Sequence, residues 1–159
     1  MNKYLSVLVL LSAISVSAVS QAIENPAVIT QPQSERFIKG LETLNQINGD
    51  GSGEKIVDVL KEVSPDLAKY AIEYGFGDLF NRTVLNHKTK EIVIIANLAA
   101  MGNAQPQLKA HINAALNIGV SKEEIAEIMI LTSAYAGFPT AINSTLALKS
   151  VLTKRKNQK

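Results

Sequence analysis

The sequence predicts an all-α protein, and three observations lead to that prediction. Apolar residues recur every three or four positions in most segments, which is the period of a helix that buries one face. Residues typical of helix starts and ends separate these segments. No segment shows the alternation of apolar and polar residues that is typical of a strand. Short turns join the segments, and no internal repeat is present, so we expect one bundle of helices.

Residues 1–22 have the pattern of a signal peptide. Lys3 supplies a positive charge, Tyr4–Val19 is apolar, and Ser20-Gln21-Ala22 places small residues at a cleavage site. We therefore expect export to the periplasm or secretion, with no membrane attachment after cleavage. An uncleaved membrane anchor is the alternative, although the apolar stretch is short for a span.

The remainder of the chain divides into three parts. Residues 23–33 contain two prolines and little periodicity, which predicts an extended arm. Residues 34–153 form the predicted helical domain. Residues 154–159 are a basic tail, which we expect to be solvated and frayed.

Composition excludes several classes of function. The chain has no cysteine, so disulfides, thiolate metal sites and cysteine nucleophiles are impossible. The formal net charge is only +2, which gives no reason to expect a nucleic-acid partner.

The first half of the domain predicts three helices. Ser34 is a predicted N-cap, and the glycine-rich segment 48–53 is a loop. A second helix is expected over Glu54–Val63. Ser64-Pro65 places a cap before proline and opens the third, which Gly75-Phe76-Gly77 is expected to kink. The apolar faces are defined by Phe37, Leu41, Leu44 and Ile47, then Ile56, Val59, Leu60 and Val63, then Leu67, Tyr70, Ala71 and Tyr74.

The segment Asn86–Gly102 is predicted to be the central helix. From Ile92 to Met101 every residue except Asn97 is apolar, and a helix that is apolar on all sides is normally buried. Asn86 is a predicted N-cap and Gly102 a predicted left-handed terminator. We therefore expect the other helices to wrap around this one.

Three more helices are expected after it. The first spans Ala104–Asn117, and the second opens at a capping box formed by Ser121 and Glu124. Gly137-Phe138-Pro139 ends the second, and the last helix runs through about Leu152. The predicted buried faces carry Leu108, His111, Ile112 and Ala115, then Ile125, Ile128, Met129, Thr132 and Tyr135.

Four stretches resemble the carboxymuconolactone decarboxylase family. They are LNHKTKEIV at 85–93, QLKAH at 107–111, ALNIGVSKEEI at 115–125 and YAGFP at 135–139. The resemblance covers about residues 36–152 and implies a bundle of the carboxymuconolactone decarboxylase and alkyl hydroperoxidase D type. It also implies a homo-oligomer, a trimer or a hexamer, with pockets between helices and near subunit contacts.

The peroxidase branch of that family does not fit this chain. Its C-x-x-C-x-x-x-H motif would place cysteines at Ala104 and Gln107, counting back from His111. Without a thiolate there is no nucleophile for a peroxide. Thiol peroxidase chemistry is therefore excluded.

Four residues are candidate catalytic groups. His111 matches the family histidine, and imidazole exchanges protons near neutral pH. Glu91 could act as a buried acid or favour the positive end of its helix. The hydroxyl of Tyr135 could reach a pocket or bond to backbone. Glu124 matches a recurrent family glutamate, although the capping box already accounts for it.

Arg82 and Asn97 are candidate substrate-binding residues. Arginine binds carboxylates in a bidentate manner, but a surface or subunit ion pair would equally explain Arg82. Asn97 would need a hydrogen-bond partner if it were buried, and a structural cross-helix bond is the alternative. His87 is expected to be solvated. We expect no metal site and no cofactor.

Two functions remain open at this stage. The first is a decarboxylase or lactone-acting enzyme for a small carboxylated substrate, without a cofactor and with His111 as general acid–base. The second is a non-catalytic oligomer of the same fold that binds a small molecule or serves a structural role. Whether the protein is an enzyme is left open, because one fold hosts several chemistries.

Overall fold

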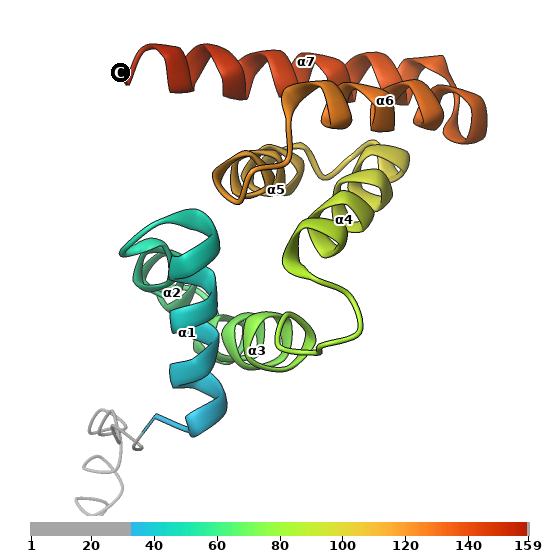
Figure 1. Cartoon of the computed structure of the whole chain (residues 1–159). Helices are drawn as coiled ribbons and strands as arrows, with labels where there is room; N and C mark the ends of the chain where they lie inside the picture. The colour runs from blue at the N-terminus through green and yellow to red at the C-terminus, as the bar shows by residue number, and fades with distance from the viewer. Residues whose placement is uncertain (1–32, 159) are drawn as a thin grey trace, which may run out of the picture. The chain divides into compact units, whose positions relative to one another are not determined.

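The computed structural model describes residues 33–158 (Figure 1). Within that range it contains seven α-helices, one π-helix and no strand, so the predicted all-α class is confirmed. The predicted signal peptide and residues 23–32 of the predicted arm lie outside the described residues. Among residues 33–158, no helix combines the length and the apolar character that crossing a bilayer requires.

The helices of the first half begin and end close to the predicted positions, but the predicted inner faces of the second and third are wrong. Their exposed side chains are Val59, Val63, Leu67, Tyr70 and Tyr74. The Ser34 side chain accepts a hydrogen bond from the Phe37 backbone N–H, and Ser64 caps the third helix in the same way with Pro65 in its first turn. The helical segments are α1 (Glu35–Asn48), α2 (Ser52–Lys61), α3 (Pro65–Tyr70) and η2 (Ala71–Leu79).

The expected kink at Gly75-Phe76-Gly77 is replaced by a π-helix that continues α3 without a break. The wider π-helical turn brings Gly77 against α1. A Cβ atom at Gly77 would overlap the Arg36 carbonyl, and one at Gly40 would overlap the Ile72 carbonyl. Only glycine therefore permits the close packing of α1 on η2.

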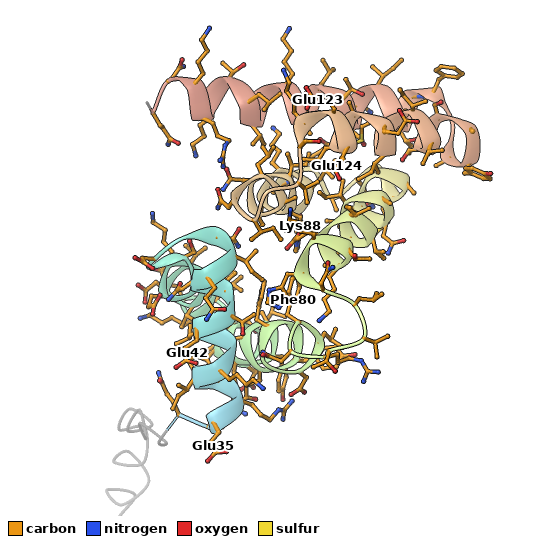
Figure 2. The ribbon with its side chains drawn as sticks, in the orientation of Figure 1. Glu35, Glu42, Phe80, Lys88, Glu123 and Glu124 are labelled. Atoms are coloured by element: carbon orange, nitrogen blue, oxygen red, sulfur yellow. The ribbon has the colours of Figure 1, made fainter. Side chains whose placement is uncertain are left out.

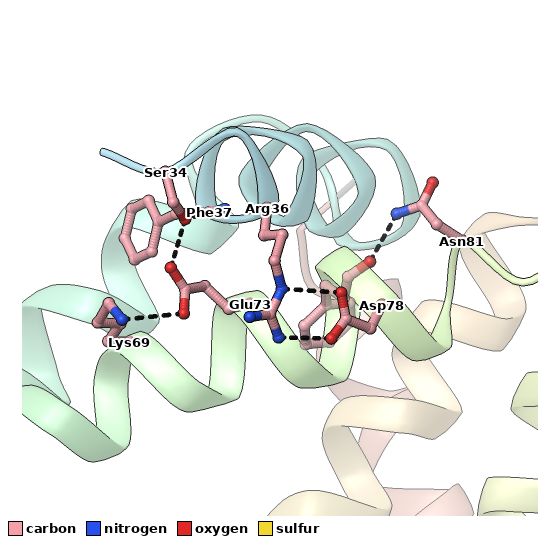
Figure 3. Close-up of polar contacts among 8 residues, drawn as sticks. Ser34, Arg36, Phe37, Lys69, Glu73, Asp78 and Asn81 are labelled. Atoms are coloured by element: carbon pink, nitrogen blue, oxygen red, sulfur yellow. Dashed lines mark hydrogen bonds and ion pairs between the residues drawn. The ribbon is translucent and has the colours of Figure 1, made fainter. Parts of the chain in front are cut away.

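Polar contacts join the same two helices (Figure 3). Arg36 donates two hydrogen bonds to the Asp78 carboxylate, and the Ser34 hydroxyl donates to Glu73. Lys69 adds an ion pair to Glu73 at 3.1 Å. The Glu73 side chain is almost completely buried, so these partners satisfy a carboxylate that could not otherwise stay charged there.

The second half of the domain contains four longer helices. Asn86 caps the first through a hydrogen bond from the Thr89 N–H at 2.9 Å, and Gly102 ends it with φ of 74°, both as predicted. The helices are α4 (His87–Met101), α5 (Gln105–Asn117), α6 (Lys122–Ala136) and α7 (Phe138–Lys156).

Helix α4 packs against α5, α6 and α7, but it is not surrounded. The prediction of a helix buried on all sides is wrong for this chain, because Val93 is 46% and Met101 62% exposed, and Asn97 is exposed as well. The helices of the first half pack mainly on one another and reach α5 through α1. One side of α4 therefore has no helix over it.

The main core lies between α4, α5, α6 and α7. Its members on α5 and α6 are all among the residues that the helical periodicity predicted to be buried. Of the other predicted residues, Thr132 is buried, His111 is half-buried and Tyr135 is exposed. A smaller cluster of Ile47, Phe80 and Ala114 joins α1 and η2 to α5. The main cluster consists of Ile95, Ala99, Leu108, Ile112, Ala115, Val120, Ile125, Ile128, Met129, Ala147, Leu148 and Val151.

Helices α6 and α7 lie side by side as a hairpin (Figure 1). Helix α7 extends to Lys156, so the prediction of a frayed tail from residue 154 is wrong for its first three residues. Arg155 explains the extension, because its guanidinium donates to the side-chain oxygens of Asn113 and Asn117 on α5. The outer face of the hairpin exposes apolar side chains: Ile130, Leu131, Tyr135, Phe138, Ile142 and Leu146.

Candidate active site

A cavity of about 680 Å³ lies where η2, the segment that follows it, α4 and α5 meet. Phe80 forms part of its wall and is labelled in Figure 2 between these elements. Its ring stacks on Phe76 with centroids 4.9 Å apart. Most of the lining is apolar, and the polar groups come from three cationic or titratable residues. The lining consists of Gly75, Phe76, Leu79, Phe80, Arg82, Val84, Leu85, Lys90, Val93, Ile94 and His111.

His111 and Glu91 form a hydrogen-bonded pair at this cavity. The His111 Nδ1 atom lies 2.9 Å from Glu91 Oε2, which links α5 to α4. The Glu91 side chain has no exposed surface, whereas the His111 side chain is 23% exposed and lines the cavity. The carboxyl group is thus behind the ring, and the ring faces the cavity.

The carboxylate determines which nitrogen of the ring is available. When Glu91 is ionised it can only accept, and His111 then donates to it from Nδ1. Nε2 is then the nitrogen that a ligand can use. The second oxygen of Glu91, Oε1, is buried and receives no hydrogen bond from the described residues. The bond from His111 is therefore the main polar interaction that holds the carboxyl group.

Arg82 lines the cavity and is exposed, in the segment between η2 and α4. Arg36 is paired with Asp78 and Arg155 with two asparagines. Among residues 33–158, the guanidinium of Arg82 has neither an ion-pair nor a hydrogen-bond partner, so it can receive a carboxylate from a ligand. His111 and Arg82 thus line the same cavity.

Lys90 also lines the cavity, and the sequence analysis missed it. Its ammonium or amine nitrogen donates to the backbone carbonyls of Phe80, at 2.5 Å, and Arg82. Burial lowers the pKa of Lys90, and the charge of Arg82 lowers it further. A signal was available, because a cation in the first turn of a helix opposes the helix dipole and calls for a reason.

The other three predicted site residues do not lie at this cavity. Tyr135 is 90% exposed on the last turn of α6, and Asn97 is exposed on α4. The expected inward position of Tyr135 is wrong because the buried stripe of α6 continues from Thr132 to Ala136, four residues on, and not to Tyr135. Asn97 is not buried, so it needs no cross-helix partner.

Glu124 lies in the capping box of α6, as its position in the sequence predicted. Its carboxylate accepts from the Ser121 backbone N–H at 2.6 Å, and the Ser121 hydroxyl accepts from the Glu124 N–H at 3.1 Å. Figure 2 shows Glu124 at the start of α6. The hydrogen bond from the Ser121 backbone is the main cause that holds the pKa of Glu124 below its usual value.

His87 was expected to be solvated, and that expectation is wrong. Its ring is half-buried, and Nε2 lies 3.2 Å from the Phe80 carbonyl. The ring also contacts the Phe80 ring, with centroids 6.0 Å apart. His87 therefore supports the segment behind the cavity wall. Within residues 33–158, no group of three or more potential metal ligands occurs.

The fold and the cavity define an all-α protein with a carboxylate–imidazole pair beside an unpaired arginine. The sequence model of the carboxymuconolactone decarboxylase family matches residues 65–150, which is more than half of the chain and includes every residue of the cavity. The protein therefore belongs to the carboxymuconolactone decarboxylase family.

Three curated relatives illustrate how far that similarity extends. The chain is 29% identical over 107 residues to a 4-carboxymuconolactone decarboxylase of Acinetobacter baylyi, covering 67% of this chain and 79% of that protein. It is 33% identical over 81 residues to an uncharacterized 15.0 kDa protein of Paracoccus denitrificans, covering 50% and 60%. It is 32% identical over 111 residues to peroxisomal protein 2 of Saccharomyces cerevisiae, covering 67% of this chain and 38% of the yeast protein.

Proposed function

We propose that the protein is a cofactor-free enzyme that decarboxylates, or opens or closes the lactone of, a small carboxylated substrate. The observation that carries this proposal is the pairing of the cavity-facing His111 with the buried Glu91. Such a pair fixes the tautomer and the orientation of the ring, which is what general acid–base catalysis requires. The name of the Acinetobacter relative, a 4-carboxymuconolactone decarboxylase, supports the reaction class.

Each group has a role in the proposed reaction. Arg82 binds one carboxylate of the substrate through its unpaired guanidinium. The carboxylate that is lost leaves as CO2, and its bonding electrons remain on the adjacent carbon. His111, protonated at Nε2, then donates a proton to that carbon, and Glu91 stabilises the imidazolium before the transfer. The apolar walls, which include Phe76, Val93 and Ile94, favour loss of charge from a carboxylate.

The alternative is a protein that binds a small carboxylate without turnover. A cavity lined only by apolar side chains, with His111 fully buried in the core, would have supported this non-catalytic alternative. Instead, the cavity holds one unpaired arginine, one lysine and a partly exposed histidine. We therefore favour the enzyme. Export through a signal peptide and assembly into a homo-oligomer stay predictions.

The test uses the purified protein and 4-carboxymuconolactone, with release of CO2 and loss of the lactone as the two readouts. Turnover is expected in the unmodified protein, and His111→Asn is expected to lower it by roughly 10²- to 10⁴-fold. Tyr135→Phe is the matched control, because this exposed side chain lies away from the cavity and its loss should leave turnover unchanged. Binding of the lactone without any release of CO2 would favour the non-catalytic alternative.

A further inference from the structure

Lys90 is the one primary amine in the cavity lining, and its surroundings differ from those of a surface lysine. The side chain is half-buried, its Nζ lies 6.0 Å from the centroid of the Phe80 ring, and Val93 and Ile94 line the same cavity. No carboxylate among residues 33–158 lies within ion-pair distance of Lys90. The lysines that form ion pairs there are Lys61, Lys69 and Lys122. The positive charge of Arg82 also acts on it.

The hydrogen bonds of Lys90 leave one position on its nitrogen without a partner among residues 33–158. A neutral amine has two N–H groups and one lone pair, whereas an ammonium has three N–H groups. Two acceptors are present, the backbone carbonyls of Phe80 and Arg82. These two carbonyls can accept both N–H groups of the neutral form, which then keeps its lone pair for a ligand in the cavity that Lys90 lines.

We propose that Lys90 is a nucleophile that forms an imine with the carbonyl carbon of a small oxo acid bound in this cavity. A lysine that is desolvated and close to another cation is a known way to obtain a reactive amine at neutral pH. The lowered pKa of Lys90 agrees with the geometry. This inference rests on the proposed function for its cavity and its acid–base pair, and it deepens that function by naming the substrate class.

The steps balance without a further reagent. The Nζ lone pair attacks the carbonyl carbon, the carbonyl oxygen takes a proton from His111, and the carbinolamine loses water to give a protonated imine. In a 3-oxo acid, the carboxylate then leaves as CO2 while its bonding electrons move toward the imine nitrogen and form an enamine. His111, which has regained a proton from solvent water, donates it to the enamine carbon, and hydrolysis of the resulting protonated imine releases the ketone and restores Lys90. Arg82 would hold a carboxylate of the incoming acid.

The experiment is reductive trapping on the full-length protein. Acetoacetate is the probe, sodium cyanoborohydride reduces any protonated imine to a stable secondary amine, and the product is analysed by intact mass and peptide mapping. We expect one adduct per chain, located at Lys90. Lys90→Arg should abolish it, since arginine can still donate to both carbonyls but forms no such imine, and thermal melting checks that this variant is folded.

Lys88→Arg is the matched control. Lys88 lies on the same helix and donates to a backbone carbonyl, that of Gly119 at 3.0 Å, but it is exposed and does not line the cavity. Figure 2 shows it at the start of α4. Trapping should persist in this variant. Equal labelling of many lysines, or an unchanged adduct in Lys90→Arg, would overturn the inference.

The outcome separates this inference from the proposed function. Trapping at Lys90 in a protein that decarboxylates neither acetoacetate nor 4-carboxymuconolactone would support the nucleophile and count against the enzyme. Decarboxylation of the lactone with no trapping at Lys90 would support the acid–base enzyme and overturn the imine. His111→Asn should slow trapping without moving the adduct to another residue.

Discussion

Glu91 on α4 holds His111 on α5 through a 2.9 Å hydrogen bond whose carboxyl side is completely buried. The two residues are 20 positions apart in the sequence, so only the packing of the two helices brings them together. The Glu91 side of the pair is buried, and the His111 ring lines the cavity. The proposed roles, His111 as proton donor and Glu91 as its positioning partner, follow from this division.

Replacement of Glu91 by glutamine tests that division. The amide oxygen can still accept from Nδ1, but it carries no charge to stabilise the imidazolium. We expect kcat for 4-carboxymuconolactone to fall by roughly 10²-fold, at the lower end of the usual range for acid–base groups. The KM should change little, because Glu91 does not line the cavity. A changed KM with an unchanged kcat would contradict the assignment of Glu91 as the partner of a catalytic imidazole.

Arg82 is expected to affect binding more than chemistry. Arg82→Gln removes the unpaired guanidinium, and a hydrogen bond to a charged group contributes about 1.5–3 kcal/mol. The KM for a carboxylated substrate should therefore rise by roughly 10- to 100-fold. Lys109→Gln is the control, because it removes one positive charge from the exposed side of α5. Equal effects of the two variants would point to general charge attraction instead of a specific site.

Replacement of Glu124 by glutamine distinguishes a role in helix capping from a role in catalysis. The structure places its carboxylate on the Ser121 N–H, at the start of α6 and away from the cavity. Glu124→Gln should lower the melting temperature slightly, because it weakens the capping of α6 by about 1 kcal/mol or less. It should leave kcat and KM unchanged. A loss of turnover in a folded Glu124→Gln variant would restore the catalytic hypothesis.

The pKa of Glu73 leads to a pH dependence of stability. The hydrogen bond from Ser34 is the main cause that lowers the pKa of this carboxyl group, and Lys69 and Arg36 add to it, while burial opposes them. Because the folded-state pKa lies below the unfolded-state pKa, the stabilisation is present above the unfolded-state value. It is lost as the pH falls through the folded-state value. The free energy of unfolding should therefore decrease on acidification below about pH 4.5.

Glu73→Gln should remove that part of the pH dependence. Denaturant titrations of the variant and the parent at neutral pH and at acid pH measure it. Glu42→Gln is the control, because Glu42 is an exposed glutamate on α1 (Figure 2). Identical acid sensitivity in all three proteins would show that Glu73 does not account for it.

Two glycines of the π-helix offer a stability test of the close packing between α1 and η2. Gly77→Ala would place a methyl group on the Arg36 carbonyl, whereas a Cβ at Gly75 meets no atom within 4 Å. We expect Gly77→Ala to destabilise by about 1–3 kcal/mol, the usual cost of overpacking. Gly75→Ala should be neutral or slightly stabilising in the same denaturation measurement. Similar effects of both changes would show that α1 can move away from η2.

Local sequence determined the helices of this protein. Ser34, Ser64, Asn86 and Ser121 each begin a helix, and Gly102 ends one, because their side chains or backbone conformations act within a single turn. The absence of cysteine excluded a thiol reaction from composition alone. The family resemblance selected His111 and Glu91, and the carboxylate chemistry of arginine selected Arg82. The structure places His111 and Arg82 in the lining of one cavity, with Glu91 bonded to His111.

Only the tertiary structure decided which side chains meet. The prediction that Tyr135 points inward failed. One residue along a helix turns the side chain by about 100°, and periodicity alone cannot fix the buried stripe to within one residue. The prediction that α4 is buried on all sides failed, because an apolar composition does not determine how many helices pack around a helix. Lys90 acquired its two carbonyl acceptors through contacts between α4 and the segment after η2, and those contacts depend on how separate helices pack.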